Sequence, residues 1–304
     1  MDIYLPIAGM SVNALLIVVL GGLVGVLSGL FGVGGGFLTT PLLIFYGIPP
    51  SVAVASATTQ ITGASVSGVL AHMRRGGVDL RMGLVMIAGG LVGSLAGAGI
   101  FRLLQSTGQI DTVIGVMYVL LLGSIGSLML RDATVALGWW KRAEAAAGAR
   151  PRHNRWVAAL PGRWRFKASG LYVSPIAPAL LGFGAGILTV LLGVGGGFIL
   201  VPAMIYILGM AARVVVGTSL VMILAVSAAT TMIHALTTQS VDIVLAALLL
   251  VGGVIGAQYG AMMTTRLKPD LLRLVLAVII LAVALRMALG LTYRPDEIFS
   301  IEYL

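Results

Sequence analysis

One seventeen-residue pattern occurs twice in the chain, and it constrains the fold more than any other feature. Residues 25–41 read GVLSGLFGVGGGFLTTP and residues 186–202 read GILTVLLGVGGGFILVP, with ten of the seventeen positions identical at an offset of 161 residues. Each copy is an apolar run, then three consecutive glycines, then a shorter apolar run that contains a proline. Because each glycine costs a helix about 1 kcal/mol relative to alanine, each copy predicts a helix broken by a sharp turn.

The composition indicates an integral membrane protein. Hydrophobic residues make up 59% of the chain, charged residues only 10%, and the mean hydropathy is +1.08. A soluble domain carries about 25% charged residues, and a helix that crosses a bilayer needs about 20 apolar ones. The chain has no cysteine and three scattered histidines, so we expect no disulfide, no metal site and no cofactor. The net charge of +9 fits basic cytoplasmic loops, and we expect no nucleic acid partner.

The apolar runs fall into two groups of five. We expect an all-α fold whose first transmembrane repeat is 1–130 and whose second is 173–304, joined by a basic, Trp-rich cytoplasmic linker at 131–172. Matched residues beyond the glycine motif, such as His72 with His234 and Asp79 with Asp242, indicate a duplication. The ten expected segments are 11–31, 37–48, 52–72, 82–104, 110–130, 173–192, 198–209, 214–236, 242–263 and 271–290.

An odd number of spans in each half would invert the second half relative to the first. With the linker inside, 16 of the 19 Lys and Arg residues fall on the cytoplasmic side, whereas a parallel arrangement places 14 there. The positive-inside rule therefore favours inverted repeats with both termini external. Segments 37–48 and 198–209 are too short to span, so each glycine turn would lie at membrane depth, as a broken helix or a re-entrant hairpin.

A turn at membrane depth exposes backbone N–H groups that need partners. Each glycine turn opens a short helix, whose N-terminus carries free N–H donors and about half a positive charge. Two such ends that meet near the midplane predict an anion site, and close packing of a bent hairpin is the alternative. Uncharged polar residues of segments 52–72 and 214–236 would complete it. The expected substrate contacts are Gly34, Gly35, Gly36, Thr59, Gln60, Gly195, Gly196, Gly197, Thr218 and Ser219.

The carboxylates are expected to have structural roles. None of the ten lies in the middle of a span, and Asp79 and Asp242 are placed to cap helix N-termini. Proton-coupled carriers usually hold a carboxylate within the membrane. Their absence from the spans favours efflux driven by the membrane potential. The stripes of glycine at every fourth position, such as Gly89, Gly93 and Gly97, are expected to pack helices closely.

The doubled GxxxGxxxGVGGGFxxxP-like pattern, together with the VGTSL run at 216–220, resembles the TauE/SafE family of membrane permeases. The resemblance implies transport, usually outward, of sulfite or organosulfonates such as sulfoacetate across a bacterial inner membrane. An anion channel or an importer of another small anion is the alternative, and a membrane-embedded enzyme is a distant one, since no nucleophile with a base is visible. The expected partners are the anion, membrane lipids and, as an open alternative, a second copy of the chain.

Overall fold

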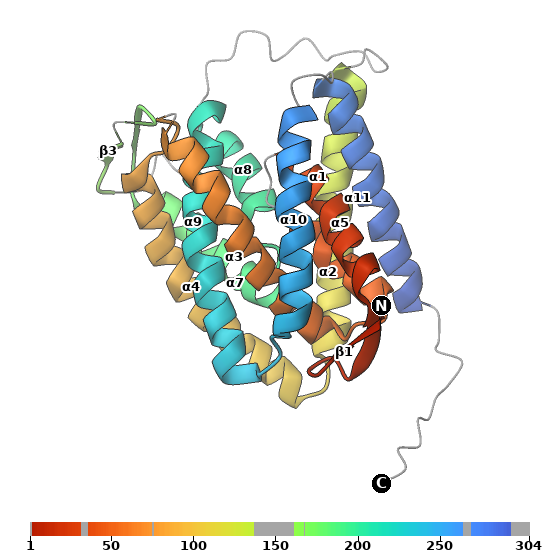
Figure 1. The fold of residues 1–304 in the computed structure, drawn as a ribbon. Coiled ribbons are helices and arrows are strands. Elements are labelled where there is room, and N and C mark those ends of the chain that lie inside the picture. The colour runs from red at the N-terminus through yellow and green to blue at the C-terminus, as the bar shows by residue number, and fades with distance from the viewer. Residues whose placement is uncertain are drawn as a thin grey trace.

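The computed structural model describes residues 2–31, 36–74, 76–136, 161–166, 168–263 and 269–292. Helices dominate these residues, and two small antiparallel hairpins accompany them (Figure 1). The hairpins pair β1 (Asp2–Leu5) with β2 (Met10–Asn13) and β3 (Trp164–Phe166) with β4 (Leu171–Val173). The helices are α1 (Ala14–Phe31), α2 (Gly36–Phe45), α3 (Pro50–Arg74), α4 (Leu80–Ser106), α5 (Ile110–Ala136), α7 (Ile176–Leu192), α8 (Gly197–Tyr206), α9 (Ala212–Ile233), α10 (Ile243–Met263) and α11 (Pro269–Thr292).

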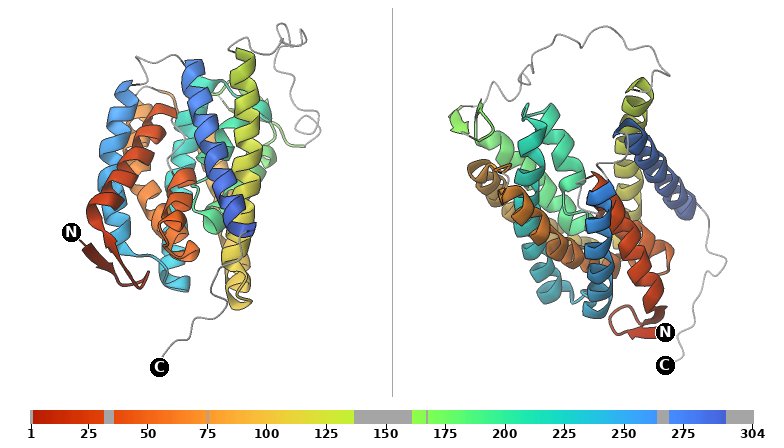
Figure 2. Two further views of the ribbon diagram at one scale, coloured as in Figure 1. Left: turned by 90° about the vertical axis from the view of Figure 1, so that its right-hand side faces the viewer. Right: turned by 45° about the horizontal axis from the view of Figure 1, so that its top comes forward.

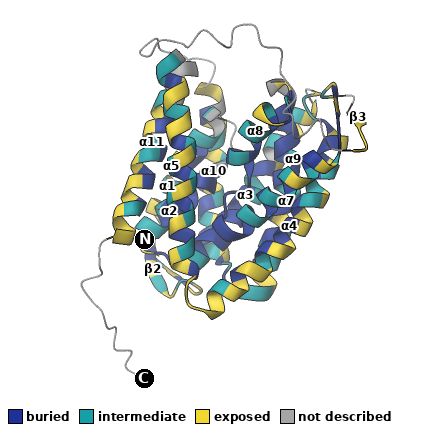
Figure 3. Cartoon of the chain, turned by 180° about the vertical axis from the view of Figure 1, so that it is seen from behind, coloured by how far each residue is buried: buried dark blue, intermediate teal, exposed yellow. Residues whose placement is uncertain are grey.

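Five of the described helices are long and apolar enough to cross a membrane, namely α4, α5, α9 with the π-helical turn that follows it, α10 and α11. Figure 3 shows exposed residues along the outer helices α4, α5 and α11, as expected for helices that face lipid. By contrast, α2 and α8 have ten residues each. At 1.5 Å per residue such a helix is about 15 Å long, half of the ~30 Å hydrocarbon core. The prediction of short segments after each glycine turn is therefore confirmed.

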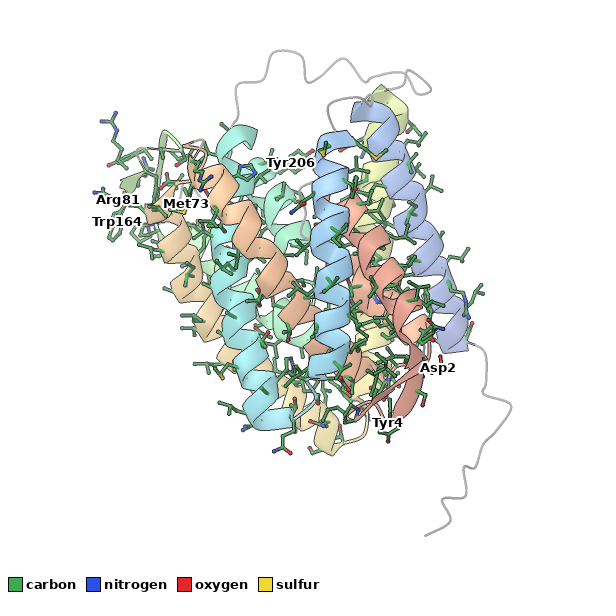
Figure 4. The ribbon with its side chains drawn as sticks, in the orientation of Figure 1. Asp2, Tyr4, Met73, Arg81, Trp164 and Tyr206 are labelled. Carbon is green, nitrogen blue, oxygen red and sulfur yellow. The ribbon has the colours of Figure 1, made fainter. Side chains whose placement is uncertain are left out.

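The helices α1 and α2, which flank the first glycine motif, are joined at their outer ends. The Asn13 N–H, just before α1, donates to the Tyr46 hydroxyl, just after α2, across 3.2 Å. The two outer ends of the α1–α2 pair therefore meet beside the N-terminal strands. Figure 4 shows Tyr206, the last residue of α8, at the end of the bundle where Met73 and Arg81 lie, and Tyr4 at the other end. The two short helices thus point to opposite ends of the bundle.

Helices of one half pack on helices of the other. The largest helix contacts pair α1 with α10, α4 with α7, α5 with α11 and α3 with α9. Figure 2 shows α5 and α11 side by side along one flank. Under the expected matching of halves, in which α1 corresponds to α7 and α4 to α10, the first two pairs are equivalent. Such equivalent pairs between the halves fit two halves related by a pseudo-twofold axis. Inversion of the halves across the bilayer stays a prediction.

The glycine stripes allow this close packing. A Cβ atom added to Gly93 on α4 would lie 2.1 Å from the Phe183 carbonyl oxygen on α7. A Cβ added to Gly256 on α10 would lie 2.1 Å from the Gly22 carbonyl oxygen on α1. Real Cβ atoms do not approach backbone that closely, so any larger residue would force the helices apart. The packing role predicted for the stripes is confirmed.

The two hairpins were not predicted, and they change the boundaries of two segments. Residues 11–13, expected to begin the first helix, belong to β2, and the Asn13 side chain accepts a hydrogen bond from the Leu16 N–H at 3.3 Å. The range 131–172, expected as linker, contains the last turns of α5 and most of the β3–β4 hairpin. Trp164 lies in β3 with 58% of its surface exposed, whereas Trp139, Trp140 and Trp156 lie outside the described residues.

Reporter fusions would test the inversion. Gly76 and Gln239 follow equivalent helices, and both have positive φ angles, +65° and +49°, in short connections that should tolerate a fusion. In the inverted arrangement a reporter at Gly76 reads cytoplasmic and a reporter at Gln239 reads external, because the basic residues near Gly76 hold that end inside. Finding both reporters on one side of the membrane would restore the parallel arrangement.

Candidate functional site

The two glycine motifs meet at the centre of the bundle. Phe37 and Phe198, the equivalent second residues of α2 and α8, stack face to face with ring centroids 4.4 Å apart and planes 4° from parallel. Both side chains are almost fully buried. The N-termini of the two short helices are therefore neighbours inside the protein, as the doubled motif predicts.

The second glycine turn has a backbone that only glycine adopts readily. Gly193, Gly195 and Gly196 have φ angles of +68°, +70° and +75°, in the left-handed region. Gly193 ends α7 and donates its N–H to the Thr189 carbonyl oxygen at 2.9 Å. Residues 193–197 are all buried. This explains the run of glycines in the motif and places the turn inside protein, where an irregular backbone is tolerated at membrane depth.

This turn presents backbone donors at the start of α8. The Gly195 and Gly196 N–H groups have no hydrogen-bond acceptor among the described residues. The carbonyl group of Gly196 accepts from the Leu200 N–H at 2.8 Å, which begins the helix. Buried donors that lack an acceptor among the described residues, together with the positive end of a helix, suit an anion. Gly197 and Gly36 are the first residues of α8 and α2, and the predicted contacts Gly34 and Gly35 lie outside the described residues.

Isoleucine side chains of α3 and α9 pack against Gly36 and Gly195. A Cβ atom on Gly36 would lie 2.0 Å from Ile61 Cδ1, and one on Gly195 would lie 2.8 Å from Ile61 Cγ2. The same atom on Gly195 would be 3.4 Å from Ile223 Cγ2. Ile61 of α3 and Ile223 of α9 are themselves equivalent, at an offset of 162 residues. The start of α2 and the second glycine turn are therefore packed against the point where α3 and α9 cross.

Two side chains anchor the end of α7 and were not predicted from the sequence. The Tyr118 hydroxyl on α5 donates to the Leu192 carbonyl oxygen. His234 Nε2 lies 3.1 Å from the Val190 carbonyl oxygen, and since a carbonyl only accepts, this nitrogen carries the proton. His234 is the C-cap residue of α9, and its side chain is fully buried. The only sequence signal for Tyr118 is a polar group within an apolar span.

Two of the predicted polar contacts lie near the middle of α3. Thr59 Oγ1 donates to the Ala55 carbonyl oxygen at 3.2 Å and lies 3.5 Å from Thr231 Oγ1 on α9. Gln60 Nε2 donates to the Leu249 carbonyl oxygen on α10 across 3.4 Å, while Gln60 Oε1 is buried without a partner. Thr231 was missed because its counterpart in the first half, Val69, is apolar.

The other two predicted contacts, Thr218 and Ser219, lie at the start of α9, apart from the mid-helix pair. Thr218 Oγ1 accepts the Asp79 backbone N–H at 2.9 Å, and Ser219 Oγ donates to the Val216 carbonyl oxygen at 2.9 Å. At the repeat offset of 162, Thr218 corresponds to Ser56 rather than to Thr59 or Gln60. The structure therefore does not bring Thr218 and Ser219 together with the middle of α3.

Asp79 and Asp242 cap α4 and α10, as predicted. Asp79 Oδ1 accepts the Met82 N–H at 3.1 Å, and Asp242 Oδ1 accepts the Leu245 N–H at 3.1 Å. The other carboxylate oxygen of each aspartate binds a hairpin of the opposite half. Asp79 Oδ2 accepts from Ser169, between β3 and β4, and Asp242 Oδ2 accepts from the Ile7 N–H, between β1 and β2. The Asp242 N–H donates to Ser56 Oγ, as the Asp79 N–H does to Thr218. The same set of hydrogen bonds, here called the carboxylate clamp, therefore occurs once around each aspartate.

Comparison with known proteins places the chain in a family. The model of the family described as sulfite exporter TauE/SafE matches residues 17–287. The chain belongs to the TauE/SafE family. This confirms the resemblance seen in the doubled motif, and it makes the chain a multi-pass membrane protein of a transport family.

Relatives in the TauE/SafE family align over most of the chain. A probable membrane transporter protein of Xylella fastidiosa (strain Temecula1) is 29% identical over 281 residues, 91% of this chain and 95% of that protein. The probable membrane transporter protein YjnA of Bacillus subtilis (strain 168) is 30% identical over 276 residues, 89% and 98% of the two chains. The sulfite exporter TauE/SafE family protein 1 of Arabidopsis thaliana is 38% identical over 85 residues, 27% and 19%. No solved structure matches the chain.

The carboxylate clamps give a stability prediction. Replacement of Asp79 by alanine removes the cap of α4 and leaves the partly buried Ser169 N–H without its acceptor. We expect the free energy of unfolding to fall by about 2 kcal/mol or more. Asp132→Ala on the exposed face of α5 is the matched control, with an expected change within about 0.5 kcal/mol. Thermal unfolding in detergent measures both, and equal melting temperatures for the two variants would contradict the clamp.

Proposed function

We propose that this TauE/SafE protein carries small sulfur-containing oxyanions, either sulfite or organosulfonates such as sulfoacetate, outward across the bacterial inner membrane. The observation that supports this most is the buried turn at 193–197, beside the start of α2, where the Gly195 and Gly196 N–H groups have no acceptor among the described residues. Backbone donors hold an oxyanion through several hydrogen bonds without a fixed positive charge, so the ion can also be released. The proposed contacts are Gly34, Gly35, Gly36, Gly195, Gly196 and Gly197, with Thr59 and Gln60 on α3.

The membrane potential supports the outward direction. Among the described residues the carboxylates of the helical region lie near helix ends. Asp79 and Asp242 are caps, Asp111 and Asp270 are the second residues of α5 and α11, and Asp132 lies near the end of α5. None is placed mid-helix to relay a proton. An anion that leaves a cell with a negative interior gains about 2.3 kcal/mol per charge per 100 mV. Export therefore needs no coupled ion.

The charge distribution supports one orientation. We propose that the end of the bundle with the β3–β4 hairpin faces the cytoplasm, because Arg74, Arg81, Arg163 and Arg165 gather near it in the sequence and the fold. Figure 4 shows Arg81 and Trp164 at this end. In this orientation both chain termini are external, and the 131–172 region contacts the cytoplasmic leaflet.

Flux measurements in proteoliposomes test the proposal. Purified protein should carry labelled sulfite and sulfoacetate, and a potential that is negative on the side the anion leaves should accelerate the flux. An uncoupled carrier should reach the electrochemical equilibrium and no further. Flux of chloride or phosphate at the same rate as sulfite would instead indicate an anion channel, and flux that needs an imposed pH gradient would contradict uncoupled export.

Glycine substitutions test the binding site itself. Gly196→Ala introduces a Cβ at φ +75°, with Ala185 Cβ and Leu200 Cδ1 at 3.2 and 3.3 Å, so we expect a loss of roughly 1 kcal/mol in stability. The Cβ also sits at the free N–H groups, so the thermal stabilisation that sulfite gives wild type should disappear.

Gly36→Ala is the comparison for packing. Its Cβ would lie 2.0 Å from Ile61 Cδ1 and 2.8 Å from the Gly193 carbonyl oxygen, a backbone atom that cannot rotate away, so this variant should lose more stability than Gly196→Ala. A Gly196→Ala protein that melts normally and keeps the full sulfite-induced shift would place the anion elsewhere.

A further inference from the structure

We propose that Gln60 selects, among the oxyanions of this site, those that carry their own N–H or O–H donor. This inference rests on the proposed function and concerns the substrate class. Gln60 is 4% exposed, and it precedes Ile61, against which the glycine turns pack. Its Oε1 atom has no hydrogen-bond partner. A buried acceptor left without a donor destabilises a protein by about 1–3 kcal/mol, so its presence calls for a reason.

The second half of the chain contains a matched position without the amide. At the repeat offset of 162, Gln60 corresponds to Met222. Gln60 Nε2 lies 2.7 Å from where a Cβ on Gly253 of α10 would stand, and Met222 Cε lies 2.8 Å from where a Cβ on the equivalent Gly90 of α4 would stand. The two side chains therefore occupy equivalent positions, each packed against a glycine of a helix in the other half. Since methionine occupies one of these positions, helix packing does not require an amide there.

The neighbouring backbone fixes which end of the amide is free. The Leu249 carbonyl oxygen, 3.4 Å from Gln60 Nε2, can only accept a hydrogen bond. Rotation of the amide by 180° would place two oxygen atoms against each other, so the NH₂ group faces Leu249. The free atom is the carbonyl oxygen, which can only accept. An anion without a proton donor gains nothing from this atom and is repelled by it.

The preferred ligands are therefore anions with a donor of their own. Hydrogen sulfite, which carries an O–H group, fits better than the sulfite dianion, and a hydroxy- or amino-sulfonate fits better than an alkyl sulfonate. Sulfoacetate carries no donor near neutral pH, so among the proposed substrates it should be carried more slowly than hydrogen sulfite. Backbone N–H groups of the glycine turn bind the sulfonate oxygens in every case, and Gln60 distinguishes the ligands by the group that they carry beside the anion. A site built to bind a hydroxyl rejects the analogue that lacks it, because the buried acceptor then stays unpaired.

The test compares hydroxyethanesulfonate with propanesulfonate, which share their charge and nearly their shape, since a hydroxyl replaces a methyl group. Proteoliposomes with wild-type protein should carry hydroxyethanesulfonate at least about tenfold faster than propanesulfonate at equal subsaturating concentrations. Gln60→Met, which copies Met222, should bring this ratio close to one. Its melting temperature should equal or exceed that of wild type, because it removes an unpaired buried acceptor.

Two outcomes would overturn the inference: a wild-type protein that carries the two sulfonates equally, or a Gln60→Met protein that keeps the preference. Met222→Leu is the matched control, which should keep the preference because its position holds no amide. Sulfite flux in the same wild-type proteoliposomes reports separately on the proposed function. Sulfite flux with equal rates for the two sulfonates contradicts only the role of Gln60, whereas absence of flux for all three anions contradicts the proposed function and the inference with it.

Discussion

Backbone N–H groups cannot stay unpaired in lipid, and this constraint shapes the whole bundle. Each half contains a helix broken by glycines, and a broken helix at membrane depth must be enclosed by protein or must face a ligand. The chain encloses its second turn completely: residues 193–197 are buried between α3 and α9, and the stacked rings of Phe37 and Phe198 hold the two short helices together. The Gly195 and Gly196 N–H groups, which have no acceptor among the described residues, are then available to an anion.

The packing of each half's helices against those of the other half follows from the same requirement that protein enclose the broken helices. The glycine stripes bring α1 against α10 and α4 against α7 at backbone contact distance, so that each broken helix is covered by a long helix of the other half. At each end of the bundle a buried aspartate, Asp79 or Asp242, joins three elements. Its carboxylate binds a helix N-terminus and a hairpin, and its backbone N–H donates to a hydroxyl of the crossing helix. Neither half could build this enclosure alone, which explains why the chain carries the motif twice.

Sequence reasoning found the features that are encoded locally. The glycine motif predicted the broken helices and their short second segments, the glycine stripes predicted close packing, and the position of Asp79 and Asp242 predicted caps. It missed the hairpin of residues 2–13, because strands of four residues give too little periodicity to separate them from the start of an apolar helix. It also missed the contacts of Tyr118 and His234, which bind the backbone carbonyl oxygens of Leu192 and Val190, 74 and 44 residues away. Finally, it grouped Thr218 with Gln60, although the repeat offset places Thr218 opposite Ser56.

The location of the bound anion tests the central claim most directly. Selenite has the shape and charge of sulfite, and selenium gives an anomalous X-ray signal that marks its position. Crystals of the protein grown with selenite should show one strong anomalous peak at the start of α8, within hydrogen-bond distance of the Gly195 and Gly196 N–H groups and close to α2. A peak at the basic β3–β4 end of the bundle, with none at the glycine turns, would contradict the account.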